Sequence, residues 1–174
     1  MLRRTTMGVL AGAALVTALR PALAQTPPPV IVAGTPSSVR ELAMAGSVFA
    51  LQTSQVALTR TSNPQVRQFA EFESAEQQAI MTAMRTVGVP TPTQIVVDPV
   101  KAQALQTLPT LSGAEFDRMY LEGQLNGHQE LLTIMSQIAA SGATPGERAI
   151  AMVAEPSIQT HIALIRGIQM GMRP

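Results

Sequence analysis

Four signals for the start of a helix, each followed by an apolar run of helical period, constrain the fold of this chain more than any other feature of its sequence. A good capping residue opens each one, at Ser38, Asn63, Ser112 and Thr144. After Ser38, Ser112 and Thr144, a glutamate follows three positions later, as in a capping box. Proline follows Asn63 and Thr144, at a position where its missing N–H is not needed. The sequence therefore predicts helices at residues 38–60, 64–87, 112–140 and 145–171.

The connections between these segments indicate how the helices are arranged. The first two and the last two are joined by very short loops, which predicts two antiparallel hairpins. The middle connection, residues 88–111, contains four prolines and is long enough to cross a bundle lengthwise. It also fits a return over a short helix near 100–108, with 95–97 as a brief extended piece. We therefore expect an all-α four-helix bundle at residues 38–171, with a long proline-containing connection between its second and third helices.

The first 24 residues have the pattern of a secretory signal peptide. Arg3 and Arg4 precede an apolar run, and a small-x-small pattern ends at Ala24. The run is shorter than the roughly 20 residues of a membrane span, so we expect cleavage after Ala24 and no transmembrane segment afterwards. The arginine pair fits both Sec and twin-arginine export. The sequence predicts a periplasmic or secreted protein, which leaves cell-envelope association open, with a flexible proline-rich lead-in at 25–37.

Composition excludes several classes of function. The chain has no cysteine, which removes disulfides, thiol catalysis and zinc–thiolate sites. Without the leader, acidic residues outnumber basic ones by two, and no basic patch with aromatic residues remains to suggest nucleic-acid binding. No nucleophile elbow, P-loop, dinucleotide fingerprint or His-Glu-x-x-His motif occurs. The sequence therefore leans against an enzyme and predicts no catalytic residue.

The two histidines of the chain each lie in the middle of an apolar helical stripe. His128 and His161 repeat with aliphatic residues at steps of three and four, which places both rings on inward faces. Glu73, Glu76 and Gln77 take inward or boundary positions on the second predicted helix. Buried titratable groups need partners. We therefore expect these five residues to form a buried polar layer that fixes the register of the helices.

The alternative interpretation of the layer is a metal site. Two imidazoles and one carboxylate can form a facial triad. The candidate ligands are Glu76, His128 and His161. Such a triad requires that Glu73 or Glu76 lies at the same height in the bundle as both rings. Di-iron sites in bundles use Glu-x-x-His pairs, whereas Leu125 and Ile158 precede these histidines by three positions. The sequence thus favours a layer without a cofactor, with a transition metal as the alternative.

Proline also occurs inside the last predicted helix. Pro156 lacks an N–H and crowds the carbonyl group of Met152. A kink there would re-aim His161, five residues later. A helix in two separate segments is the other expectation.

Several stretches resemble an exported bacterial family known as domain of unknown function 4142. They are residues 63–70, residues 111–117 with Tyr120 and His128, and Pro156 with His161. The resemblance covers roughly 38–169 and implies export and a ferritin-like bundle, with no established activity. In the second helix the family usually carries an acidic-acidic-His stretch, where this chain has Ala75, Glu76 and Gln77.

The first helix of the family often carries a pair of glutamates, and the matching positions here are Ala50 and Gln52. A metal-binding member would therefore have lost several ligands in this chain. The sequence predicts an exported helical bundle that acts as a non-catalytic binding or envelope-stress module, with an unknown partner. The alternative is a metal-binding ferritin-like protein or oxidoreductase that uses Glu76, His128 and His161.

Overall fold

A computed structural model describes residues 30–90 and 92–172 of the chain. The predicted signal peptide, its cleavage site and the first residues of the lead-in lie outside this range. Among the described helices, none combines the length and the apolar character needed to cross a membrane.

The described part of the chain is mostly helical, which confirms the all-α prediction. It contains five α-helices: α1 (Val39–Arg60), α2 (Pro64–Thr86), α3 (Pro99–Thr107), α4 (Gly113–Ser141) and α5 (Pro145–Gly171). Helix α3 continues into a 3₁₀ turn, η1 (Leu108–Thr110), and two short strands are present, β1 (Val30–Ala33) and β2 (Gln94–Val97). The four predicted helices correspond to α1, α2, α4 and α5, and no boundary differs by more than one residue.

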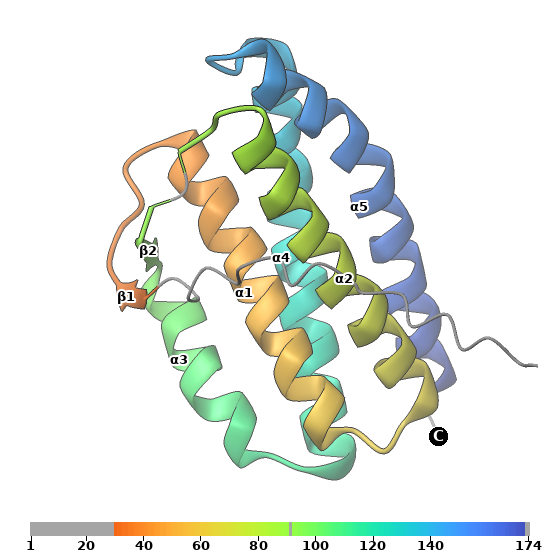
Figure 1. Ribbon diagram of the computed structural model, residues 1–174. Coiled ribbons are helices and arrows are strands. Elements are labelled where there is room, and N and C mark those ends of the chain that lie inside the picture. Colours follow the sequence, from red (N-terminus) through yellow and green to blue (C-terminus); the bar gives the residue numbers. More distant parts are fainter. Residues whose placement is uncertain (1–29, 91, 173–174) are drawn as a thin grey trace, which may run out of the picture.

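The four long helices lie side by side (Figure 1). Helix α1 packs against α2 and α4, and α5 packs against the same two helices from the other side. After α2 the chain returns along the outside of α1 through β2 and α3 before α4 begins (Figure 1). Because this connection runs the length of the molecule, α2 and α4 point in the same direction. The connection therefore crosses lengthwise and also contains the short helix near 100–108.

The two strands form a small parallel sheet that packs on α1. Val30 pairs with Gln94, and the register continues to Ala33 and Val97. Ile31, Ile95 and Val97 pack with Met44, Ala45 and Val48 of α1. Strand β1 lies inside the stretch for which the sequence predicts a flexible lead-in. Its β-branched residues become ordered because β2, far away in the sequence, supplies both backbone partners and an apolar face.

The predicted helix caps form to different extents. Thr144 and Glu147 make a complete capping box, and the Asn63 side chain accepts hydrogen bonds from the backbone of α2. At Ser38 only half of the predicted box forms, because the Glu41 carboxylate instead accepts from the N–H and hydroxyl of Ser37.

The box predicted at Ser112 is wrong. Within the described residues the Ser112 side chain makes no capping hydrogen bond. Gly113 begins α4 with a φ of +58°, whereas the first residue of a boxed helix has a φ near −60°. The hydroxyl of Ser112 is therefore not aligned over the free N–H groups of the first turn.

Helix α5 runs through Pro156 without a break, so the prediction of two separate segments is wrong. Proline removes one backbone hydrogen bond. Ala154, Ile158 and Ile162 nevertheless lie buried in one core cluster on either side of it. Their packing on α4 holds the helix together across the missing bond.

Gly46→Ala tests the close approach of α1 and α4. A Cβ atom at Gly46 would lie 2.7 Å from Cδ2 and 2.9 Å from Cγ of Leu131. We expect this overpacking to lower the free energy of unfolding by about 1–3 kcal/mol, measured by urea denaturation. The matched control is Gly167→Ala on α5, where the added Cβ would meet no described atom within 4 Å beyond its chain neighbours and the backbone of its own helix. The control should raise stability by about 0.5–1 kcal/mol, and an equal gain at Gly46 would contradict the close approach.

Candidate metal centre

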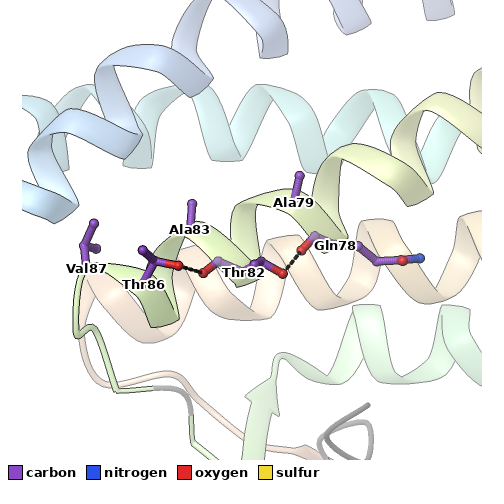
Figure 2. A pocket seen from close by; sticks show the side chains of 6 residues that line it. All are labelled: Gln78, Ala79, Thr82, Ala83, Thr86 and Val87. Atoms are coloured by element: carbon purple, nitrogen blue, oxygen red, sulfur yellow. Dashed lines mark hydrogen bonds between the residues drawn. The ribbon is translucent and has the colours of Figure 1, made fainter. Parts of the chain in front are cut away.

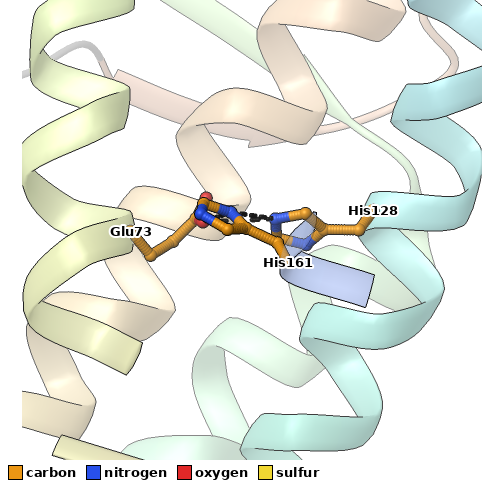
Figure 3. Close-up of side chains that lie close together, drawn as sticks. All are labelled: Glu73, His128 and His161. Carbon is orange, nitrogen blue, oxygen red and sulfur yellow. Dashed lines mark hydrogen bonds and ion pairs between the residues drawn. The ribbon is translucent and has the colours of Figure 1, made fainter. Parts of the chain in front are cut away.

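Three buried titratable side chains from three helices meet in the core. Glu73 comes from α2, His128 from α4 and His161 from α5 (Figure 3). Their exposed fractions are 0%, 1% and 6%. Each lies near the middle of its helix, between the cluster that contains Phe69 and Tyr120 and the cluster that contains Leu131 and Ile158.

One atom of each side chain points to the same small region (Figure 3). His161 Nδ1 lies 2.7 Å from Glu73 Oε2, and His128 Nε2 lies 3.2 Å from the same oxygen. The two ring nitrogens are 3.2 Å apart. These three atoms form a compact triangle of two nitrogens and one oxygen.

The other polar atoms of these side chains face outer partners. His128 Nδ1 lies 2.7 Å from the carbonyl oxygen of Gln124, four residues earlier on α4. Glu73 Oε1 accepts a hydrogen bond of 2.8 Å from the Gln77 amide. Oε2 of Glu76 accepts a hydrogen bond of 2.8 Å from the Ser157 hydroxyl and lies 3.4 Å from His161 Nε2, as an ion-pair contact.

The contacts of the two rings indicate where their protons lie. A carbonyl oxygen only accepts, so His128 carries its proton at Nδ1, and in a neutral ring Nε2 keeps its lone pair. His161 faces two carboxylates, Glu73 at 2.7 Å from Nδ1 and Glu76 at 3.4 Å from Nε2. Because Glu73 is the closer acceptor, it favours a proton at Nδ1 of His161, and a metal ion at the centre would take the place of that proton.

Electrostatics favour a negative Glu73 beside a positive His161. Burial raises the pKa of Glu73, but hydrogen bonds and charge from His128 and His161 outweigh it and lower the pKa to about 2. Burial lowers the pKa of His161, but its hydrogen bond to Glu73 and the charges of Glu73 and Glu76 raise the pKa above its ordinary value. In the metal-free protein, a proton on His161 therefore supplies the positive charge.

The triangle has the dimensions of a set of metal ligands. Histidine nitrogen and carboxylate oxygen bind transition metals at about 2.0–2.2 Å, so neighbouring ligands at right angles lie about 3 Å apart. The observed separations of 2.7, 3.2 and 3.2 Å are close to this value. Glu73, His128 and His161 thus form a group that is able to hold one metal ion.

A second polar network connects this group to α1. The Gln124 amide donates to the carbonyl oxygen of Ala50 and to the hydroxyls of Thr53 and Ser54. Ser54 is 2.9 Å from the Tyr120 hydroxyl. The sequence analysis missed Gln124, although its position four residues before His128 on the same stripe was a usable signal. Helix α1 supplies no ligand to the group among the described residues, but it holds the turn of α4 that orients His128.

The structure brings all five residues of the predicted polar layer together through the hydrogen bonds and ion-pair contacts above. It separates the roles of the two glutamates: Glu73 lies where the two rings meet, and Glu76 lies on the outer side of His161. Glu73 follows Phe69 and precedes Gln77 at steps of four, which places these three buried residues on one stripe of α2. Glu76 lies at the edge of that stripe, and its side chain is 28% exposed.

A separate pocket of about 510 Å³ lies along the last turns of α2 and is open to solvent. It is lined by Gln78, Ala79, Thr82, Ala83, Thr86 and Val87 (Figure 2). The hydroxyls of Thr82 and Thr86 donate to carbonyl oxygens of their own helix (Figure 2). The lining of this pocket contains no titratable side chain.

A family model matches most of the chain. The model of a family described as "Domain of unknown function (DUF4142)" matches residues 20–168. This range contains the three buried titratable residues and their outer partners. No curated protein and no solved structure matches the chain.

The metal-free protein is expected to be most stable between about pH 4.5 and 6.5. Ionised Glu73 stabilises the fold fully above its ordinary pKa of 4.5, and this contribution is lost as the pH falls towards about 2. Protonated His161 stabilises the fold fully below its ordinary pKa of 6.5, and this contribution is lost as the pH rises through the raised pKa. Urea denaturation in the presence of a chelator, across this range, measures both effects.

Two variants separate this ion pair from the other titrating groups. His161→Gln has no ring charge to lose, so its stability should decline less than that of the wild type on the alkaline side. Glu71→Gln removes an exposed carboxylate from the same helix and should keep the wild-type profile. Equal alkaline declines in the wild type and His161→Gln would contradict the ion pair.

Proposed function

Because the chain belongs to the family described as domain of unknown function 4142, a description that assigns no activity, we propose its function from its own core. The protein binds one divalent first-row transition-metal ion through Glu73 Oε2, His128 Nε2 and His161 Nδ1. This proposal replaces Glu76 by Glu73 in the ligand set considered from the sequence. It keeps both histidines.

One observation carries the proposal: two ring nitrogens and one carboxylate oxygen meet in the core, separated by 2.7, 3.2 and 3.2 Å. Ligating histidines commonly donate their other N–H to a carboxylate or a backbone carbonyl. His128 has the carbonyl of Gln124 in this role, and Glu73 is oriented by the Gln77 amide. The carboxylate of Glu76 lies 3.4 Å from the other nitrogen of His161.

The ligand set selects a class of metal. Two imidazole nitrogens and one carboxylate oxygen suit Fe(II), Mn(II), Co(II), Ni(II), Cu(II) or Zn(II). Ca²⁺ and Mg²⁺ prefer sites made only of oxygen ligands. Three protein ligands leave further coordination positions for water or a small molecule, as in facial-triad and open zinc sites.

Metal binding is compatible with both functions expected from the sequence, a non-catalytic binding module and a metal-binding protein. It requires no redox reaction. The lengthwise connection between α2 and α4 supports a ferritin-like four-helix arrangement, in which ligands project inward from facing helices. In this arrangement α2, α4 and α5 hold the ion, and α1 holds the turn of α4 that bears His128.

We place this function outside the cytoplasm. The support is the leader pattern at residues 1–24, with its charged start, short apolar run and small residues before the cleavage site. Expression of the full chain in a bacterial host should yield a periplasmic protein that begins at Gln25, measured by cell fractionation and N-terminal sequencing. Recovery of an intact N-terminus from the cytoplasm would contradict this placement.

Metal titration of the chelator-treated protein tests the proposed site. We expect one ion of Zn(II), Co(II), Mn(II) or Fe(II) per chain, measured by elemental analysis after dialysis. A ligand at 100 times its Kd stabilises a fold by about 2.7 kcal/mol, which corresponds to a rise in Tm of roughly 5–10 °C for a domain of this size. Bound Co(II) should also show visible absorption bands that report its coordination.

Substitutions in the ligand set provide the comparison. Glu73→Gln and His161→Gln should lose stoichiometric binding and the rise in Tm. Glu71→Gln makes the same change of charge as Glu73→Gln at an exposed position of α2 and should retain both. If no ion binds stoichiometrically to the wild type or shifts its Tm, the proposed metal site is wrong.

A further inference from the structure

We infer that the metal ion enters and leaves the buried centre between α2 and α5, at the hydrogen bond from Ser157 to Glu76, and that Pro156 makes this part of α5 able to open. This inference rests on the proposed metal site and adds the route by which that site is filled. It assigns a role to three residues that are not in the proposed ligand set.

The other sides of the centre are closed by buried side chains. Between α1 and α4, the Gln124 side chain is 1% exposed and donates to three groups of α1. Between α4 and α5, Leu131 and Ile158 pack in one core cluster. Between α1 and α2, Ala57 and Ala70 are fully buried in another. On these sides an ion would have to pass between closely packed groups.

The side between α2 and α5 is different, because exposure rises there from the centre outwards. The side chain of Glu73 is 0% exposed, that of His161 is 8% exposed and that of Glu76 is 28% exposed. Glu76 Oε2 lies 3.4 Å from His161 Nε2. A carboxylate that is in contact with water and beside a candidate ligand attracts a cation to this side of the centre.

Few contacts join α2 to α5 at this height. The two helices run side by side (Figure 1), and they pack closely at one end, where a Cβ atom at Gly146 would lie 2.8 Å from Cβ of Val87. Near the centre, the Ser157 hydroxyl donates to Glu76 Oε2 at 2.8 Å. Both of these side chains are partly exposed, so water can replace the hydrogen bond when the helices separate locally.

Pro156 weakens α5 directly beside this hydrogen bond. Because proline has no N–H, the carbonyl oxygen of Met152 lacks the backbone donor that it would have in a regular helix. Pro156 is exposed, so its ring fills no space in the core. The cluster that holds α5 on α4 contains Ala154 and Ile158. The hydrogen bond of Ser157 can therefore break while α4 and α5 remain packed.

An entry route affects rates and not affinity. If the ion passes only through a locally open state, the rate constants of binding and of release both scale with the population of that state, and their ratio is unchanged. Local opening also differs from global unfolding, because it does not respond to stabilisation of other parts of the fold. These two differences make the route measurable.

The experiment measures the rates of Zn(II) binding to the metal-free protein and of Zn(II) release to excess chelator, by stopped-flow mixing. Ser157→Ala removes the bond to Glu76, and we expect both rate constants to rise about 3–10-fold, the effect of one hydrogen bond. Pro156→Ala restores the missing donor of α5, and both should fall by a similar factor. The Kd for zinc should stay at its wild-type value in both variants.

Two controls and a second measurement separate the route from general effects on stability. Gly167→Ala strengthens the same helix away from this contact, and Ser141→Ala removes a hydroxyl that donates within α4. Both controls should keep the wild-type rates. Amide hydrogen exchange of the metal-free protein at residues 157–161 should become faster in Ser157→Ala and slower in Pro156→Ala.

The outcomes distinguish this inference from the proposed function. If the wild type binds zinc and neither Ser157→Ala nor Pro156→Ala changes the rates, the route is overturned and the metal site stands. If Gly167→Ala slows release as much as Pro156→Ala, the ion leaves by global unfolding and the route is overturned. If Ser157→Ala alters one rate constant alone, it acts on the bound state, which also overturns the route. If the wild type binds no zinc, the proposed function fails as well.

Discussion

The carboxylate of Glu73, fully buried between two imidazole rings, is the constraint on which the rest of the structure depends. Removing one partner of a buried ion pair costs about 3–5 kcal/mol, because the remaining charge has no water around it. Glu73 therefore requires that α4 and α5 present His128 and His161 at its own height. Slippage of either helix by one turn would leave the charge without its partner.

The order of the helices makes this alignment feasible. Two hairpins with short loops, α1 with α2 and α4 with α5, bring helices of similar length side by side. The connection through β2 and α3 returns the chain along α1, so α2 and α4 point in the same direction (Figure 1). Residues near the middle of α2, α4 and α5 then lie at a common height. Glu73, His128 and His161 each occupy such a position.

Outer contacts orient two of the three central side chains. The Gln77 amide donates to Glu73, and His128 Nδ1 contacts the backbone carbonyl of Gln124. The Gln124 amide in turn donates to Ala50, Thr53 and Ser54 of α1. The carboxylate of Glu76 lies 3.4 Å from His161 at the rim of the core. Helices α1, α2, α4 and α5 are therefore joined by polar contacts at the height of the centre.

The sequence by itself determined the helices and their inward faces. Capping residues, prolines, glycines and the period of apolar residues are local signals, and they placed four helices and both buried histidines correctly. The sequence left open which glutamate meets the rings, because Glu73 and Glu76 are three residues apart and both lie on or near the inward stripe. Only the packing of α2 against α4 and α5 decided for Glu73. Tertiary contacts likewise decided the pairing of β1 with β2 and the continuity of α5 at Pro156, because each depends on atoms from segments far away in the sequence.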